Sequence, residues 1–188
     1  MSISPGAITE VCYVTHDMEK TAARWASLVG GGPFYLMPMP EMTFEGADGR
    51  LFSGRIKAAL GFSGTTLVEF IEPLGDSPAI FREVLDACGD GAMHHVMTNV
   101  RPMSADDFDR QCLAYEQAGL PRVLKFEVPG QGRNCFYDAR AELGAFIEVL
   151  QVPDHAFDML DRMQAAHQAA DRGRPLQALA DLFADAAH

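Results

Sequence analysis

Two segments of this chain repeat each other, and this repeat limits the possible folds more than any other feature. Residues 8–19 and residues 93–104 both read as an apolar strand followed by a polar helix start. Their superposition sets Glu10 against His95. A repeat of this kind predicts two similar structural modules within the chain.

A second pair of segments extends the repeat. Residues 67–73 and 146–153 are both apolar strands with a mid-strand glutamate at the third position, and both end at proline. Here Glu69 falls against Glu148, with an offset of 79 residues, and the offset of the first pair is 85 residues. The two copies therefore stay nearly in register over a whole module.

Composition is consistent with one compact unit. The 188 residues are 48% hydrophobic, which is enough for a substantial core. A net charge of −11 argues against a nucleic-acid partner, because phosphate binding requires clustered lysine and arginine. The four cysteines are widely spaced, which predicts reduced thiols. No segment resembles a signal peptide or a bilayer span, so we expect a cytoplasmic protein without a membrane partner.

Each module is predicted to have the element order βαβββ. We expect one domain over residues 7–153, made of modules at about 7–75 and 92–153 and joined by a short helix at 78–88. The predicted strands are 8–15, 34–39, 55–62 and 65–71 in the first module, and 93–100, 122–128, 133–138 and 145–152 in the second. The predicted helices begin at Asp17 in the first module and span 104–118 in the second.

Residues 154–188 lie outside the repeat and are predicted to form a helical C-terminal extension. A break at 171–175 separates a first helix from a last short one. The apolar stripe of this tail is expected to dock on a surface that the modules leave uncovered. There it either closes one end of the cleft or joins two subunits, and we favour the second alternative, a homodimer. The stripe consists of Phe157, Leu160, Met163, Leu176, Leu179 and Phe183.

Alternation along the strands places four polar side chains on open sheet faces. Each module has a helix to cover one face, and an ionised carboxylate under an apolar helix would be costly unless it were paired. Glu10, Glu69, His95 and Glu148 would then face a shared cleft. Three crowded carboxylates without a cation would force protonation, so a divalent metal ion is the simplest common partner.

The quoted segments resemble the vicinal oxygen chelate superfamily, which includes glyoxalase I, methylmalonyl-CoA epimerase, extradiol dioxygenases and bleomycin-resistance proteins. The resemblance covers roughly residues 7–153 and is especially similar to the epimerase branch at residues 68–78. It implies an α+β fold in which two βαβββ modules pair into a cupped mixed-sheet barrel. By position it also implies metal ligands at Glu10, Glu69, His95 and Glu148.

Glu10 departs from that pattern, because the epimerases and dioxygenases usually have histidine at this position. A third carboxylate makes the site harder and more anionic than Fe(II) oxygen chemistry requires, which disfavours a dioxygenase. Such a site suits Zn²⁺, Ni²⁺, Co²⁺, Mn²⁺ or Mg²⁺ as a Lewis acid. We therefore expect a lyase, isomerase or epimerase of a small organic substrate. A ligand-sequestering protein of the bleomycin-resistance type is the alternative.

The expected reaction is proton transfer next to a carbonyl. Crowding raises the pKa of carboxylates toward neutrality, which suits a general base. By resemblance to glyoxalase I, Glu10 or Glu148 serves as that base.

Further residues are candidates for substrate contact. Arg133 and Tyr137, on the strand before Glu148, are candidates to reach the cleft and bind an anionic group, and Cys12 shares the face of Glu10. Structural roles compete with these assignments, because isolated cysteines are usually buried packing residues. Alternation sends His94 to the face opposite His95, which predicts a structural role for His94. His16 is expected at the surface, and Glu41 and Glu45 in a solvated loop.

Overall fold

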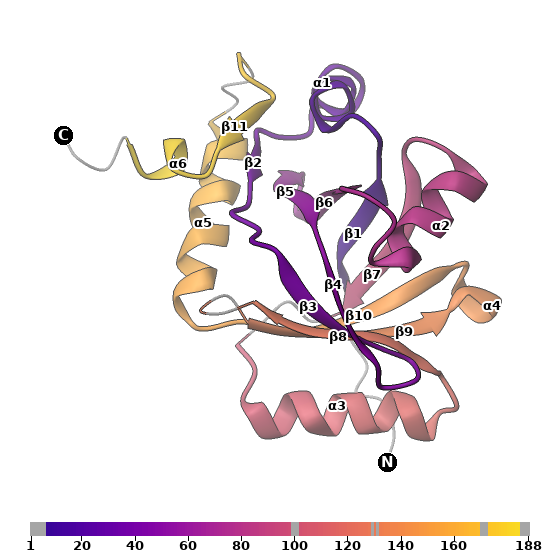
Figure 1. Cartoon of the computed structure of the whole chain (residues 1–188). Helices are drawn as coiled ribbons and strands as arrows, with labels where there is room; N and C mark the ends of the chain where they lie inside the picture. Colours follow the sequence, from indigo (N-terminus) through magenta and orange to yellow (C-terminus); the bar gives the residue numbers. More distant parts are fainter. Residues whose placement is uncertain (1–6, 99–101, 129, 131, 170–172, 185–188) are drawn as a thin grey trace.

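The structure, a computed structural model, describes residues 7–98, 102–128, 130, 132–169 and 173–184. These residues form one mixed sheet of eleven strands with helices packed around it (Figure 1). The strands of the first module are β1 (Ile8–Val14), β2 (Phe34–Leu36), β3 (Met42–Gly46), β4 (Leu51–Gly54), β5 (Ile56–Ser63) and β6 (Thr66–Pro73). Those that follow are β7 (Ala92–Thr98), β8 (Arg122–Val128), β9 (Gly132–Ala139), β10 (Ala145–Gln151) and β11 (Leu176–Ala178). The helices are α1 (Met18–Val29), α2 (Ala79–Cys88), α3 (Ala105–Gln117), α4 (Arg140–Leu143), α5 (His155–Gln168) and α6 (Asp181–Ala184).

The strand order reflects the sequence repeat. Neighbouring strands follow the order β11-β2-β5-β6-β1-β7-β10-β9-β8-β3-β4. The first strands of the two modules, β1 and β7, pair antiparallel at the centre. Each pairs in parallel with the last strand of its own module, β6 or β10. The sheet curls into a half-barrel, so the predicted α+β fold of two βαβββ modules is confirmed, and the central strands of both modules lie together.

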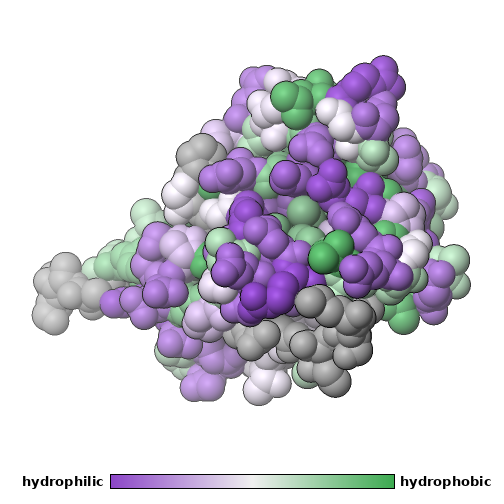
Figure 2. Space-filling model, turned by 90° about the horizontal axis from the view of Figure 1, so that it is seen from below, coloured by the Kyte–Doolittle hydropathy of each residue, from purple (hydrophilic) through white to green (hydrophobic). Residues whose placement is uncertain are grey.

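Helices α1 and α3 cover the outer face of the curled sheet. Asp17 caps α1 by accepting a hydrogen bond from the backbone of Lys20, and Gly30 ends the helix in the left-handed conformation. Ser104 caps α3 in the same way, because its side chain accepts a hydrogen bond from the backbone N–H of Asp107. Apolar side chains of both helices pack against the sheet. Figure 2, which views the molecule from the α3 side, shows that the outward surface there is largely hydrophilic, as expected for an amphipathic helix.

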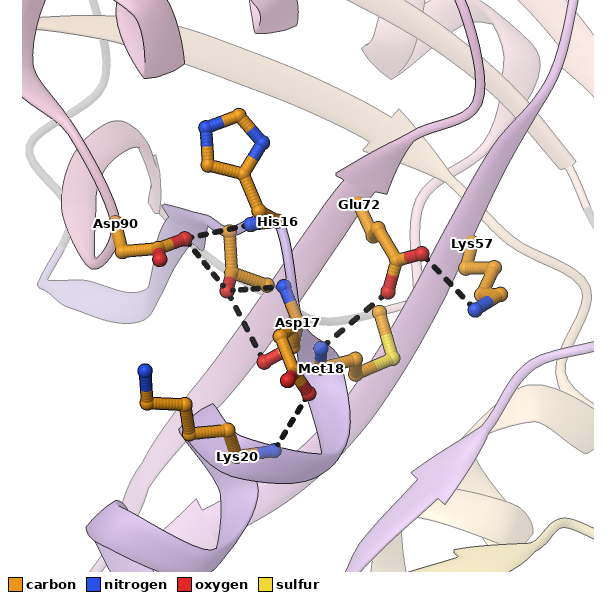
Figure 3. A network of polar contacts seen from close by, with 8 residues as sticks. His16, Asp17, Met18, Lys20, Lys57, Glu72 and Asp90 are labelled. Atoms are coloured by element: carbon orange, nitrogen blue, oxygen red, sulfur yellow. Dashed lines mark hydrogen bonds and ion pairs between the residues drawn. The ribbon is translucent and has the colours of Figure 1, made fainter.

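A polar network ties the start of α1 to neighbouring strands and turns (Figure 3). The Asp90 carboxylate accepts hydrogen bonds from the backbone of His16, at 2.6 Å, and from the Thr15 hydroxyl, at 3.2 Å. Glu72 accepts from the backbone of Met18 and pairs with Lys57. His16 itself is exposed, as predicted. The network fixes the turn that follows β1, and so fixes the end of the strand that carries Glu10.

Two segments differ from the prediction, and both lie at the edges of the sheet. The expected loop around Glu41 and Glu45 contains the hairpin β3–β4, which crosses to pair with β8 of the second module. Glu45 forms ion pairs there with Arg122 and Lys125. Residues 176–178 form strand β11 beside β2, where a helix was expected. In both cases an exposed sheet edge offered hydrogen bonds that local sequence does not reveal.

The end of the predicted strand 93–100 lies outside the described residues. Within the described part of the chain, no helix is both long and apolar enough to span a membrane.

Candidate metal centre

The four predicted side chains come together at the centre of the sheet. Glu10 lies on β1, Glu69 on β6, His95 on β7 and Glu148 on β10, which are four adjacent strands. One ligand atom from each lies within 4.8 Å of every other. The register explains this convergence, because Cys12 pairs with both Glu69 and His95, and Glu148 pairs with Met97.

His95 lies at the middle of the three carboxylates. Its Nε2 atom is 2.9 Å from Oε2 of Glu148, 3.3 Å from Oε2 of Glu69 and 4.0 Å from Oε1 of Glu10. None of these contacts has hydrogen-bond geometry, so Nε2 is buried without a hydrogen-bond partner among the described residues. Such an atom is costly in a native protein unless it binds something else.

Burial and mutual repulsion raise the pKa of the carboxyl groups. The pKa of Glu10 is raised well above its usual value, first by burial and then by the charges of Glu69 and Glu148. Burial is also the main cause of the raised pKa of Glu148, which His95 opposes. Three carboxylates in this space are therefore under electrostatic strain that a cation would relieve.

Hydrogen bonds behind His95 orient its ring. Nε2 of His94 lies 3.2 Å from the carbonyl oxygen of Ile80, which can only accept, so this nitrogen carries a proton. Burial lowers the pKa of His94 well below its usual value and keeps the ring neutral, which makes its Nδ1 an acceptor. Nδ1 of His95, 2.9 Å away, donates to it. Burial alone would lower the pKa of His95, but Cys12 and Glu148 outweigh it and hold this pKa well above its usual value. The proton at Nε2 therefore faces the carboxylates, and a bound metal ion would take its place while the bond to His94 keeps the ring oriented.

The position of His94 corrects the expectation that it lies on the face opposite His95. A register shift in the β1–β7 pairing opposes Cys12 to His95 and Tyr13 to Met93, which leaves His94 as an extra residue. A bulge of this kind disrupts strict alternation, so neighbouring side chains can point to the same side. His94 is buried and stacks on Phe146, with ring centroids 4.8 Å apart.

The donor set fits a divalent metal ion. Two atoms bound to one ion at about 2.1 Å lie at most about 4.2 Å apart, and the four ligand atoms already lie within 4.8 Å of one another. Carboxylate oxygens with one imidazole nitrogen suit hard or borderline divalent cations. The unpartnered Nε2 of His95 is the atom that such an ion would satisfy.

Cys12 lies beside this cluster, and its sulfur, Glu69 and His95 form a second possible ligand set. Burial, the largest cause, raises the pKa of the Cys12 thiol well above its usual value. The side chain has no exposed surface and packs within the core. It does not line the cavity described below, so the structure gives it a packing role and not the expected substrate contact.

Arg133 and Tyr137 lie on the other face of the sheet, which corrects the expectation that they reach the cleft. Arg133 donates to Gln151 and to the carbonyl of Ala105, and its guanidinium lies over the Phe108 ring of α3. Tyr137 is fully buried against Tyr115 of α3.

Asn134 and Phe136, the intervening residues of β9, line the cavity instead. Strand alternation places Asn134 and Phe136 on one face of β9 and Arg133 and Tyr137 on the other. Which face of β9 points into the cavity depends on the pairing of Phe136 with Glu148. That cross-strand register is absent from a single sequence.

A cavity of about 540 Å³ opens over the carboxylates. Glu10, Glu69 and Glu148 line it, whereas His95 is fully buried beneath them. The remaining walls are largely apolar and come from both modules and from the C-terminal tail; they include Met37, Ile71, Phe81, Met97, Phe126 and Leu160. Sequence reasoning missed these walls because they are assembled from strands far apart in the chain.

Comparison with known proteins supports the fold. No family model and no curated protein sequence matches the chain. Among solved structures, the methylmalonyl-CoA epimerase from Mycobacterium tuberculosis has a TM-score of 0.56 at 17% identity, over 84% of this chain and 95% of that one. A hypothetical protein, BH1468 from Bacillus halodurans, has a TM-score of 0.56 at 14% identity, over 80% and 97%.

A variant of the Streptomyces coelicolor methylmalonyl-CoA epimerase, in complex with 2-nitronate-propionyl-CoA, has a TM-score of 0.53 at 15% identity, over 80% of this chain and 97% of that one. The chain thus has the vicinal oxygen chelate fold that the sequence resemblance implied. At these identities the likeness concerns the fold alone.

Proposed function

We propose that this protein is a divalent-metal-dependent isomerase, epimerase or lyase that moves a proton next to a carbonyl group of a small organic substrate. The observation that carries the proposal is the convergence of Glu10, Glu69, His95 and Glu148, within 4.8 Å of one another, at a cavity of about 540 Å³. A structural ion pair would need neither the cavity nor the unpartnered imidazole nitrogen.

The four residues would hold the cation, with Nε2 of His95 as the nitrogen ligand. A bound Zn²⁺, Ni²⁺, Co²⁺, Mn²⁺ or Mg²⁺ ion would polarise substrate oxygens as a Lewis acid. The three carboxylates line the cavity, so a substrate oxygen can approach the same centre. The largely apolar walls lower the local dielectric constant, which strengthens charge interactions at the centre.

A carboxylate at the cavity would take the proton. Glu10 and Glu148 are the two candidates, and their distances from the imidazole separate them. Oε2 of Glu148 is 2.9 Å from Nε2 of His95, whereas Oε1 of Glu10 is 4.0 Å away. Glu10 is therefore the carboxylate more easily released from a shared ion, and it is our candidate general base.

The structural neighbours add support for the epimerase alternative. Two of the similar structures are methylmalonyl-CoA epimerases, and epimerisation next to a carbonyl is a proton transfer of the proposed kind. A dioxygenase is disfavoured because the site offers one imidazole and three carboxylates.

A binding protein of the bleomycin-resistance type is the second candidate. The largely apolar cavity lining favours it, because ligand-sequestering sites are mostly apolar and need no chemistry. The two candidates differ in turnover. A binding protein would retain its ligand unchanged, with or without the metal ion.

Hydrogen exchange tests the proposal directly. The protein is loaded with each of the five metals and incubated in D₂O with a panel of α-hydroxy ketones and thioesters, and loss of the proton next to the carbonyl is followed by NMR. We expect metal-dependent exchange that Glu10→Gln abolishes, while the variant still binds metal. Glu127→Gln, at an exposed position of β8, is the matched control and should exchange normally. Exchange at the same rate without metal, or in Glu10→Gln, would refute the mechanism.

A further inference from the structure

The C-terminal tail, from α5 to α6, is built into the first module. Helix α5 packs against β5, and β11 extends the sheet beside β2. Met163 of α5 is fully buried in a cluster with Tyr35, Phe62 and Leu67. Figure 1 shows α5 and β11 along the β2 side of the sheet, away from α3. The tail is therefore part of the fold, and its inner side chains have fixed positions.

Polar contacts hold α5 at the turn between β5 and β6. Nδ1 of His167 donates to the carbonyl of Gly32 at 2.8 Å, and its Nε2 accepts from the backbone N–H of Gly64 at 3.0 Å. Gln164 donates to the carbonyl of Gly64 at 2.9 Å. These bonds fix the rotation of the helix, and so determine which of its side chains face the cavity.

The tail contributes an apolar wall to the cavity over the carboxylates. Met159 and Leu160 of α5 line the cavity, together with Leu179 and Phe183. The same cavity contains the carboxylates of the candidate metal centre. A ligand that bridges the two regions must therefore combine a metal-binding oxygen group with an apolar body.

Charge further restricts the ligand. Arg162 and His155, both on α5, are the basic side chains that line the cavity within the described residues, and no lysine lines it. The guanidinium of Arg162 already lies over the Phe183 ring, 5.4 Å from its centroid. Phosphate groups require several lysine or arginine partners, so a ligand with several phosphates finds too few of them inside.

Building on the proposed function, we propose that the substrate is a carbonyl compound without phosphate groups, whose apolar body lies against the tail. Its carbonyl oxygen would approach the metal centre, while the body contacts Met159 and Leu160. The volume of about 540 Å³ lies within the range of sites for drug-sized ligands. The phosphates of a CoA thioester would have to remain outside this cavity, so the CoA portion should contribute nothing to binding within it.

A series of alkyl hydroxamates tests the proposal, because each has two adjacent oxygens that chelate metals and a chain of chosen length. Binding to the metal-loaded full chain is measured by titration calorimetry from acetohydroxamate to octanohydroxamate. We expect affinity to increase by up to about fourfold for each added methylene. CoA alone should not displace octanohydroxamate. An affinity independent of chain length, or displacement by CoA, would overturn the proposal.

A pair of variants locates the effect on the tail wall. Leu160→Trp adds bulk on the cavity side of α5 and should weaken octanohydroxamate at least tenfold while acetohydroxamate is unaffected. Ala165→Trp makes the same kind of change at an exposed position of the same helix and should bind the whole series normally. Equal effects of the two variants would show that the alkyl chain of the hydroxamate binds away from Leu160, which would contradict the proposal.

A metal-free arm separates this proposal from the proposed function. Straight-chain alcohols from butanol to octanol lack a chelating group, and their binding is followed by thermal shift of the metal-free protein. Stabilisation that grows with chain length supports the apolar wall even if no metal binds. Hydroxamates that bind equally well with and without metal would refute the metal centre and leave the wall in place. No dependence on alcohol length would refute the wall.

Discussion

The two modules contribute unequally to the candidate metal centre. The second module provides His95, which has no exposed surface, and Glu148, whose Oε2 lies 2.9 Å from the imidazole. The first module provides Glu10 and Glu69, whose oxygens are 4.0 and 3.3 Å from the same nitrogen. The side chain of Glu69 is also the most exposed of the four, at 15%. The second module therefore provides the close imidazole–carboxylate pair, and the first module provides the two carboxylates that lie farther from the imidazole.

Packing explains this difference. Behind His95 lie His94 and the ring of Phe136, with a centroid separation of 5.0 Å for the Phe136 contact. No hydrogen bond among the described residues reaches the carboxylates of Glu10, Glu69 or Glu148, so this support from behind applies to His95. A ligand held from behind keeps its geometry, whereas a ligand held only by a shared cation can leave it. We expect substitution of His95 to reduce metal binding most, and substitution of Glu10 to reduce chemistry.

The largest effect is expected for His95→Ala. Removal of the nitrogen ligand leaves three carboxylates without the group at their centre, and metal affinity should fall more than the roughly 10–100-fold typical of residues behind a ligand. Elemental analysis after dialysis measures the loss, and circular dichroism checks the fold. Glu127→Gln is the control on an exposed strand position. Unchanged metal content in His95→Ala would contradict the assignment.

A smaller effect is expected for His94→Phe. Phenylalanine keeps the ring packing against Phe81 and Phe146 but removes the acceptor for Nδ1 of His95. The ring of His95 can then adopt the other tautomer, so metal affinity should fall about 10–100-fold. The ¹⁵N chemical shifts of His95 report the tautomer directly. An unchanged tautomer would show that His94 acts through packing alone, and exposed His16→Phe is the matched control.

The comparison also predicts a pH dependence for the metal-free protein. The pKa of Glu10 is raised in the folded state, first by burial, so the folded protein binds this proton more tightly than the unfolded chain. Its contribution to stability is complete below about pH 4.5 and is lost as the pH increases through the raised pKa. Every tenfold difference in proton affinity between the folded and unfolded states contributes about 1.4 kcal/mol to the free energy of unfolding.

Thermal unfolding from pH 4 to 9 measures this effect. Glu10→Gln should lose the part of the decline that Glu10 causes, whereas Glu127→Gln should follow the unsubstituted protein. Added metal should stabilise the protein most at the high end of the range, because protons no longer compete for the carboxylates. Parallel curves for Glu10→Gln and the unsubstituted protein would show that folding does not raise the pKa of Glu10.

The repeat made the central strands of the sheet predictable, whereas the edge strands could not be predicted from it. Glu10 and His95 could be superposed because both modules place a polar side chain at the same point of their first strand. Strand alternation then identified the inward faces of β1 and β6 correctly. It failed at His94, because a bulge depends on the partner strand, and at Arg133, because the facing of β9 depends on register.

Edge contacts escaped prediction for a related reason. The hairpin β3–β4 and strand β11 gain their hydrogen bonds from strands distant in sequence, β8 and β2. Segments 42–54 and 176–178 contain no local pattern that selects those partners. Tertiary context decides the structure of such short strands.

The smallest effect is expected for Phe183→Ser, on the mass of the protein in solution. A homodimer remains our prediction, and light scattering of the unsubstituted chain tests it. The structure changes the expected role of the tail in that dimer, because Leu160, Met163 and Leu179 contact the chain's own first module. Phe183 is 46% exposed and is thus the side chain of the predicted stripe best placed to contact a second subunit. We expect the dimer mass to persist in Phe183→Ser. A monomer mass for this variant alone would place the tail in the interface. A monomer mass for the unsubstituted chain would show that the homodimer prediction is wrong.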